Sequence, residues 1–355
     1  MDIHQFNPTL STGDAISNHV ISLQTMLQAM GHQSKIFCEI PPVSAAAHTL
    51  SLDEYEVYSA PENILLLHFS LHYSDWVMDR LTRLPGKKIL IFHNITPPHY
   101  FLGVNNMYFE AASRGYAQLT VLSVLTDAGW GDSDFNTRIL QQHGWQKTGI
   151  LPIAFDERSY AVTPAPKIKN RYASGTKVLF VGRVSPNKRF EDLLVAFHYL
   201  KKLRPDAQLL LVGSTQKMTR YVDFLQTLID RLNLKDVHFL GHVSLAELAA
   251  CYQIGDVFLN MSEHEGFGVP LLESMHYGLP VVAYKSTAVS ETLGDSGILF
   301  REKDYRAIAA LIDVLLSDDA LRRKIIEGQR RRLKNFSVAQ VQTQLRHLLA
   351  DVGVN

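Results

Sequence analysis

The sequence has 355 residues, of which 46% are hydrophobic and 20% are charged. This composition is typical of a soluble globular protein, and the length exceeds what one hydrophobic core usually supports, so two domains are expected. Lys and Arg together number 35, as do Asp and Glu, which leaves no net charge to attract nucleic acid. The two cysteines, Cys38 and Cys251, form no Cys-x-x-Cys pair, which argues against a disulfide framework or a zinc ribbon.

The beginning of the chain has no basic segment followed by an apolar run, so we expect no signal peptide. No apolar stretch approaches the roughly 20 residues that a membrane-spanning helix needs. The sequence therefore predicts a cytoplasmic protein.

The first half alternates short apolar runs with helical patterns. Residues 13–30 have helical spacing and end at Gly31, which suits the C-terminus of a helix. Ser133 suits the N-cap of a later helix, whereas the short run 126–132 contains two glycines and its assignment stays open. The expected strands are residues 2–7, 35–39, 63–69, 87–94 and 150–154.

The second half has a clearer pattern of apolar runs that are rich in Val, Leu and Phe and do not alternate with polar residues. Strands of a parallel sheet that are buried on both faces have this composition. Segments with helical spacing, such as 190–203 and 218–232, separate the runs, which predicts a doubly wound α/β domain. The expected strands are residues 177–184, 208–213, 237–243, 256–262, 280–284 and 297–300.

Residues 163–174 contain two prolines and no periodicity, so we place the interdomain linker there. The domains would then be residues 1–162 and 163–336, followed by a last helical pattern within 337–355. Ligands of open α/β sheets bind beyond the C-terminal ends of the strands, so two such domains facing each other would hold two substrates between them.

The segment Glu265–Glu273 follows an expected strand and is the main candidate for a binding site. Gly266 and Gly268 allow a backbone to approach a ligand, and Pro270 suits the first turn of a helix, whose N–H groups favour an anion. Glu265 and Glu273, the latter expected in the first turn, could accept hydrogen bonds from hydroxyl groups. The alternative is that Glu273 complements the helix dipole and Glu265 is a solvated loop residue.

Three segments taken together resemble a known family. They are residues 262–284 (SEHEGFGVPLLESMHYGLPVVAY), the triplet Ser290-Glu291-Thr292, and Phe180-Val-Gly-Arg183 followed by Lys188. They are similar to the retaining glycosyltransferases of family 4, closely over the second half of the chain and loosely over the first. The resemblance implies the α/β GT-B fold, in which two Rossmann-like domains face each other across a central cleft. The first domain would bind the acceptor, the second would bind a nucleotide-sugar donor, and the last helix would pack back on the first.

The resemblance also implies roles for single residues. Glu265 would contact the donor sugar and Glu273 the ribose, while Arg183 and Lys188 would bind the diphosphate. Cleavage of a sugar–phosphate bond leaves charge on the diphosphate, which such cations stabilise. His93, at the end of an expected strand, would touch the donor sugar or the acceptor; the structural alternative is a strand-end histidine satisfied by backbone.

Further positions follow from the same resemblance. The loop with Gly13 and Asp14 would lie near the donor phosphates and the acceptor, and the loop at His242 would hold the nucleotide base through its backbone. The expected catalytic residues are Glu265, Arg183, Lys188 and His93. The expected donor-binding residues are Gly13, Asp14, Gly182, His242, Val243, Gly266, Phe267, Gly268, Val269 and Glu273.

The implied reaction transfers a hexose with retention of configuration, with GDP-mannose as the favoured donor and UDP-hexoses next. The acceptor would be a glycan or a lipid-linked oligosaccharide of polysaccharide or lipopolysaccharide biosynthesis. A lipid-linked acceptor would place the enzyme peripherally at the inner face of the membrane. No metal or other cofactor is expected, because Arg183, Lys188 and a helix N-terminus neutralise the diphosphate.

Other functions stay open, namely a sugar-nucleotide epimerase, a glycoside phosphorylase, or a non-catalytic sugar-nucleotide-binding partner of another transferase. Two metal-like patterns are interpreted structurally. Asp132-Ser-Asp134 lies at an expected helix start, where capping is the better interpretation. His68 and His72 have a helical spacing, but His68 ends an apolar strand and no third ligand is near in sequence.

Overall fold

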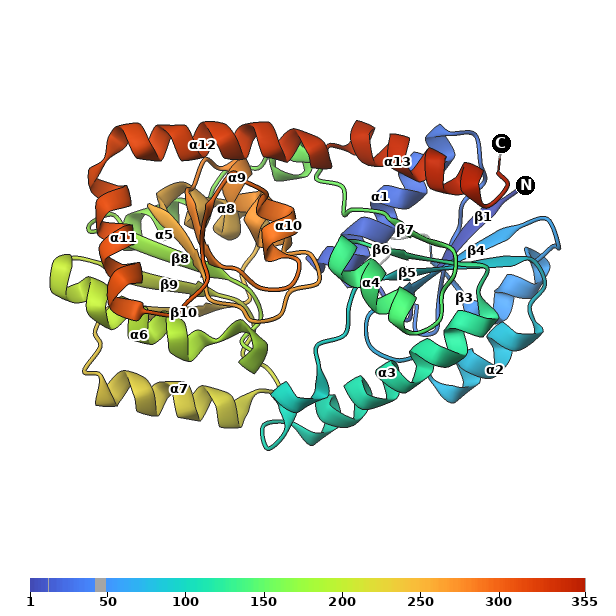
Figure 1. Cartoon of the computed structure of the whole chain (residues 1–355), viewed down its shortest axis with the longest axis horizontal. Coiled ribbons are helices and arrows are strands. Elements are labelled where there is room, and N and C mark those ends of the chain that lie inside the picture. Colours follow the sequence, from blue (N-terminus) through green and yellow to red (C-terminus); the bar gives the residue numbers. More distant parts are fainter. Residues whose placement is uncertain (12, 42–48, 355) are drawn as a thin grey trace. The chain divides into compact units, whose positions relative to one another are not determined.

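The computed structural model describes residues 1–11, 13–41 and 49–354, and it contains two compact units. The first unit comprises Met1–Pro98, Met107–Ala154 and Phe336–Asn355, and the second comprises His99–Asn106 and Phe155–Asn335 (Figure 1). The chain therefore enters the second unit at Phe155, before the boundary that the sequence suggested, and a short segment of the first half also belongs to the second unit.

The first unit is built on a parallel sheet of seven strands in the order β3-β2-β1-β4-β5-β6-β7. The order reverses between β1 and β4, as in a Rossmann-like domain. Strand β3 was not expected, and β7 lies earlier in the chain than the expected strand 150–154. The strands are β1 (Ile3–Phe6), β2 (Ile36–Cys38), β3 (Thr49–Ser51), β4 (Ile64–Phe69), β5 (Lys87–Phe92), β6 (Ala128–Gly131) and β7 (Thr148–Ile150).

Helices cover both faces of this sheet. On one face, Leu27 of α1 and Leu345 of α13 share a core with apolar side chains of β1, β4, β5 and β6. Figure 1 shows α2 and α3 on the opposite side, where Arg114 of α3 pairs with Asp75 of α2 at 2.7 Å. The helical segments are α1 (Ala15–Ala29), η1 (Leu52–Val57), α2 (Asp75–Arg83), η2 (Pro98–Phe101), α3 (Asn106–Leu125), α4 (Asp134–Gln142) and α13 (Val338–Asp351).

The second unit is built on a parallel sheet of six strands in the order β10-β9-β8-β11-β12-β13. All six strands expected for this half are confirmed, and the order reverses between β8 and β11. Both units are thus Rossmann-like, as the sequence predicted. The strands are β8 (Lys177–Val181), β9 (Gln208–Val212), β10 (Val237–Gly241), β11 (Val257–Asn260), β12 (Val281–Tyr284) and β13 (Ile298–Phe300).

The helices of the second unit include one in the segment that was interpreted as a linker. Helix α5 begins with Pro166, which suits a first helical position, and it is too short to show periodicity. It packs on α8, where Lys167 pairs with Glu247 at 2.6 Å, so the linker prediction is wrong. The helical segments are η3 (Glu157–Tyr160), α5 (Pro166–Arg171), η4 (Pro186–Lys188), α6 (Phe190–Leu203), α7 (Thr219–Arg231), α8 (Leu245–Ile254), α9 (Val269–His276), α10 (Val289–Leu293), α11 (Tyr305–Ser317), α12 (Asp319–Leu333) and η5 (Lys334–Phe336).

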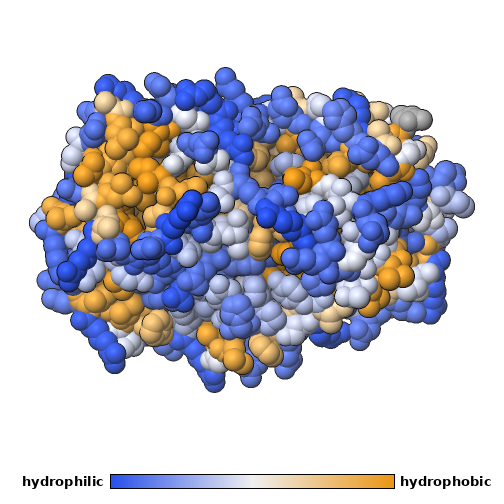
Figure 2. All heavy atoms as spheres, viewed as in Figure 1, coloured by the Kyte–Doolittle hydropathy of each residue, from blue (hydrophilic) through white to orange (hydrophobic). Residues whose placement is uncertain are grey.

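Hydrophilic residues cover most of the face drawn in Figure 2, and hydrophobic residues gather there in a few patches, the largest of them over the second unit. Within the described part of the chain, no helix combines the length and the apolar character that crossing a membrane requires. The apolar runs of the sequence are instead strands of the two sheets, buried in the middle of each sheet and half-buried at β7, β10 and β13.

Candidate active site

The site is built where the strand order of the second unit reverses. Strands β8 and β11 are parallel neighbours, with Val178 opposite Val257 and Leu179 opposite Phe258. Their C-terminal loops, residues 182–189 and 261–268, therefore leave the same edge of the sheet side by side. In open α/β sheets this reversal point is where ligands bind, because the two loops diverge from it to opposite faces.

Hydrogen bonds between main chain and side chain join these two loops. The side-chain amide of the buried Asn187 donates to the carbonyl of His264 at 3.0 Å, and the N–H of Glu263 donates to the carbonyl of Asn187 at 2.9 Å. Thr287 holds Glu265, the residue after His264, because its hydroxyl accepts from the N–H of Glu265 at 2.9 Å and donates to the carbonyl of Glu265 at 2.8 Å. The loops are thus fixed relative to each other.

The fixed loops bring together two of the predicted catalytic residues. The ammonium Nζ of Lys188 lies 2.5 Å from Oε2 of Glu265, and the two side chains are 21% and 11% exposed. A cation and a carboxylate that are largely removed from water interact more strongly than the same pair at the surface. This pair is chemically suited to hold an anion and a hydroxyl group next to each other.

The residue after Lys188 has a structural task. Arg189 has a φ of 53°, in the left-handed region that a residue with a side chain adopts at a cost. Its guanidinium pairs with Glu191 at 3.0 Å, Asp192 at 3.2 Å and Glu263 at 3.3 Å, and these ion pairs hold the turn.

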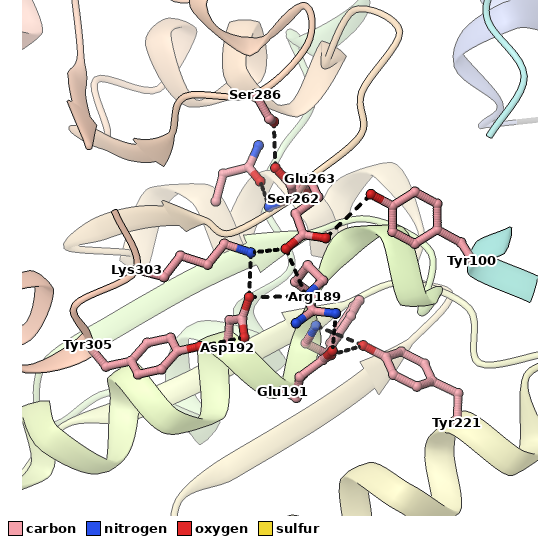
Figure 3. A network of polar contacts seen from close by, with 12 residues as sticks. Tyr100, Arg189, Glu191, Asp192, Tyr221, Ser262, Glu263, Ser286, Lys303 and Tyr305 are labelled. Atoms are coloured by element: carbon pink, nitrogen blue, oxygen red, sulfur yellow. Dashed lines mark hydrogen bonds and ion pairs between the residues drawn. The ribbon is translucent and has the colours of Figure 1, made fainter. Parts of the chain in front are cut away.

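Figure 3 shows that these carboxylates belong to a wider network. Lys303 pairs with Asp192 at 2.5 Å and with Glu263 at 2.7 Å, and the Tyr100 hydroxyl lies 3.4 Å from the other oxygen of Glu263. The Tyr305 hydroxyl donates to Asp192 at 2.8 Å. The network connects the segment after β8 with the loop after β11 and with Lys303 and Tyr305 at the start of α11, so it holds the two loops that carry Lys188 and Glu265.

Glu273 lies deeper than the sequence suggested. Helix α9 begins at Val269, so Glu273 is in its second turn and the first-turn prediction is wrong. Its side chain accepts hydrogen bonds from the hydroxyls of Tyr160 at 2.7 Å and Tyr252 at 2.6 Å, and the residue is only 7% exposed. Burial raises the pKa of Glu273, and the two tyrosine hydrogen bonds oppose this rise. No local sequence pattern pointed to either tyrosine.

The other predicted donor-binding residues of the second unit lie at the same sheet edge. Gly182 and the exposed Arg183 follow β8, and the N–H of Gly182 donates to the carbonyl of Val212 at 2.8 Å. His242 is exposed and Val243 half-buried after β10. After β11, Gly268 has a φ of 91° and is the N-cap of α9, and the carbonyl of Phe267 accepts from the Thr292 hydroxyl at 2.6 Å. Gly266 and Val269 flank these two residues.

Three predicted residues belong to the first unit instead. Gly13 has a φ of 78°, a conformation that favours glycine, and Asp14 caps α1 by accepting from the N–H of Ser17 at 2.9 Å. The neighbouring Thr12 lies outside the described residues. His93 follows β5, and its side chain is 1% exposed. Its Nε2 is hydrogen-bonded to Nδ1 of His68 at 2.9 Å.

The Asp-x-Asp pattern has the capping character that we expected. The Ser133 hydroxyl accepts from the N–H of Asn136 at 3.2 Å and caps α4, and Asp134 pairs with Arg138 one turn on. Asp132, in contrast, is buried and faces His93, which capping alone does not explain. Among residues 1–11, 13–41 and 49–354, no group of three His, Cys, Asp or Glu side chains is arranged to hold a metal ion.

Residues 163–332 match the family model of the glycosyl transferases group 1. The matched residues make up most of the second unit. Lys188, Glu265, Glu273 and Tyr252 lie inside the matched segment, whereas Tyr100 and Tyr160 precede it.

Two curated relatives match part of the chain. The chain is 32% identical over 168 residues to the O-antigen chain mannosyltransferase B of Escherichia coli, which covers 47% of this chain and 43% of that protein. It is 31% identical over 205 residues to the N-acetyl-alpha-D-glucosaminyl L-malate synthase of Bacillus anthracis, which covers 56% of this chain and 52% of that protein. The match thus spans about half the length of these relatives.

A solved structure extends the similarity of fold to both units. HepE of Anabaena, in complex with UDP and glucose, aligns with 99% of this chain and 100% of its own at a TM-score of 0.77 and 18% identity. Together with the two parallel sheets, this similarity confirms the expected α/β GT-B fold class with two Rossmann-like domains.

Proposed function

We propose that the chain is a retaining glycosyltransferase that moves a hexose from a nucleotide diphosphate sugar to a hydroxyl group of a glycan or a lipid-linked oligosaccharide. The observation that carries this proposal is the Lys188–Glu265 pair, held at 2.5 Å at the reversal point of the second sheet. A cation for the diphosphate and a carboxylate for sugar hydroxyls stand there side by side, as the transfer requires.

The residues of the site have distinct tasks in this reaction. Lys188 and Arg183 neutralise charge on the diphosphate, and the N-terminus of α9 adds the positive end of a helix dipole. Glu265 accepts hydrogen bonds from the sugar. Glu273 accepts from the ribose with the lone pairs that its two tyrosines leave unused, since a carboxylate offers about four acceptor positions.

The chemical step is a displacement on the face of the sugar that the diphosphate leaves. The bond between the anomeric carbon and the phosphate oxygen breaks, and the acceptor oxygen forms a bond to the same carbon from the same side. The proton of the acceptor hydroxyl passes to the departing phosphate oxygen, so the products are the glycoside and the nucleoside diphosphate. Charge that develops on the phosphate is stabilised by groups already in place.

The donor order is GDP-mannose first and UDP-hexoses next. The name of the Escherichia coli relative, a mannosyltransferase of O-antigen chains, supports mannose and a polysaccharide acceptor. The UDP in the HepE complex supports a UDP-hexose as the second choice. A lipid-linked acceptor would bring the enzyme to the inner face of the membrane.

A panel of nucleotides tests the proposal. We expect GDP to raise the unfolding midpoint more than UDP does, because a ligand that binds only the folded protein stabilises it. Lys188→Ala should weaken GDP binding by about 10- to 150-fold, since a hydrogen bond to a charged group contributes about 1.5–3 kcal/mol. The matched control is Lys235→Ala, an exposed lysine of the same unit. If no nucleotide raises the midpoint, the proposal is wrong.

Two further measurements test the reaction. The anomeric configuration of the product, followed by NMR, should equal that of the donor, and an inverted product contradicts the displacement described above. Transfer should continue in the presence of a chelator, because the proposed mechanism neutralises the diphosphate with side chains and a helix N-terminus. Loss of transfer on chelation, restored by added metal ion, would contradict metal independence.

A further inference from the structure

A row of buried polar side chains crosses the first sheet, and the function proposed above does not use most of it. Four adjacent strands contribute one member each: Gln5 from β1, His68 from β4, His93 after β5 and Asp132 after β6. All four residues are buried, and consecutive members contact one another. The four side chains thus form one continuous row of contacts at the C-terminal edge of the sheet.

The direction of the hydrogen bonds in this row is fixed at one end. Nε2 of Gln5 donates to the carbonyl of Val20 at 3.1 Å, and a carbonyl can only accept. The opposite amide orientation would place two acceptors against each other, so Oε1 of Gln5 faces Nε2 of His68, at 3.0 Å. An amide oxygen also only accepts, and Nε2 of His68 therefore carries a proton.

The remaining contacts can then be counted. One proton must lie between Nδ1 of His68 and Nε2 of His93, which are 2.9 Å apart. Nδ1 of His93 makes no hydrogen bond but lies 3.5 Å from Oδ2 of Asp132, so a proton on one of these two atoms is needed to keep a ring lone pair from facing a carboxylate. Three contacts thus need three protons, whereas two neutral imidazole rings supply two.

The surroundings favour keeping this third proton. The titratable groups that face His93 are His68, Asp132 and the ring of His19, whose centroid is 5.5 Å away and edge-on. Burial lowers the pKa values of His19 and His68 well below their ordinary values and raises the pKa of Asp132, so His19 does not replace the proton and His68 is not the ring that holds it. An ionised Asp132 without the proton would be a buried charge without a countercharge, which is costly.

Asp132 also reaches the turn that follows His93. Its other oxygen accepts from the side-chain amide of Asn136, whose oxygen accepts from the side chain of Asn94 at 2.6 Å. Asn94 has a φ of 77°, in the left-handed region, so the turn depends on contacts that hold it there. The same carboxylate therefore fixes the ring of His93 and the backbone after it.

We infer that Asp132, His93 and His68 together hold one proton more than a carboxylate and two neutral imidazole rings, so that the buried triad has no net charge. Asp132 is then a positioning residue for His93 and for the turn at Asn94. The proton count stands independently, and only the consequence for transfer rests on the proposed function.

Asp132→Asn tests the inference without removing a contact. The carboxamide can donate to Nδ1 of His93 and still accept from Asn136, so all three contacts are satisfied by two neutral rings. Asp134→Asn, two residues away and paired with Arg138 outside the triad, is the matched control. Histidine ¹⁵N NMR at pH 8, with His93→Gln to assign the signals, reports an imidazolium, and infrared spectroscopy reports a protonated carboxyl group.

We expect the wild-type protein to show either an imidazolium from the triad or a protonated carboxyl band at pH 8, and Asp132→Asn to lose it while Asp134→Asn keeps it. The absence of both signals from the wild-type protein would overturn the inference, whether or not the variant folds. In transfer assays, kcat/KM of the wild-type enzyme should fall at alkaline pH as the proton leaves, and Asp132→Asn should lack this fall. A chain with the spectroscopic signal but no transferase activity would contradict the proposed function and leave the proton count intact.

Discussion

Replacing Glu265 by glutamine should separate two effects of this carboxylate on a bound nucleotide. Glu265 pairs with Lys188 at 2.5 Å, so a diphosphate must share the lysine with it. The carboxylate also repels the diphosphate, because both are negative. A donor sugar, in contrast, gains a hydrogen-bond acceptor from it. Glu265→Gln should therefore strengthen the binding of GDP and slow the transfer of the sugar.

The size of each effect follows from the geometry. The two side chains are partly buried, 21% and 11% exposed, so the pair is at least as strong as the better surface ion pairs, about 1 kcal/mol. Releasing Lys188 from it should lower the Kd of GDP about five-fold. Weakening a hydrogen bond between a charged group and the sugar costs about 1.5–3 kcal/mol, which lowers kcat/KM about 10- to 150-fold.

Isothermal titration with GDP and a transfer assay with the full donor measure these quantities on the same preparations. Glu302→Gln, at an exposed glutamate of the same unit, controls for the change of net charge. The gain in GDP affinity should shrink as salt is added, because the contributions are electrostatic. If Glu265→Gln weakens GDP binding as much as it weakens transfer, Glu265 binds the nucleotide itself and the reasoning is refuted.

Two further predictions concern the first unit. Burial lowers the pKa of His19, so below pH ~6.5 the unfolded chain takes up a proton that the folded chain does not. The free energy of unfolding should therefore fall by up to about 1.4 kcal/mol per pH unit on acidification. Denaturant unfolding at pH 7 and pH 5.5 measures this fall, which should be smaller in His19→Leu. An equal fall in both proteins would assign the effect to other groups. Leu345→Ala should lower the free energy of unfolding by about 2–5 kcal/mol because Leu345 of α13 is fully buried in the core of the first unit, whereas the exposed Arg346→Ala should have little effect. Equal effects would show that α13 does not complete this core.

The sequence predicted the parts of the structure that depend on neighbouring residues along the chain. The strands of the second unit were found because most of their side chains are apolar, as burial on both faces of the central strands requires. Lys188 and Glu265 could be placed together because both follow such strands, and the Rossmann-like order makes these strands neighbours. The motif resemblance then supplied the roles that the spacing alone left open.

The features that the sequence did not predict depend on contacts between residues that are distant along the chain. Residues 163–174 were interpreted as a linker because α5 is too short to show periodicity, although α8 stabilises it. Tyr160 and Tyr252 reach Glu273 from segments that no local pattern connects with it. Asp132 was interpreted through its neighbours at a helix start, whereas its partner His93 comes from the adjacent strand end.

The position of α13 has a consequence for the order in which the protein is made. Its residues follow the whole second unit along the chain, yet their side chains fill part of the core of the first unit. The first unit therefore emerges with an apolar face still open, and it stays so while the whole second unit is synthesised. Domains usually fold as they emerge, beginning with the N-terminal one. Here the second unit can complete its core first, and a chain that stalls before residue 338 leaves the first unit exposed to chaperones and proteases.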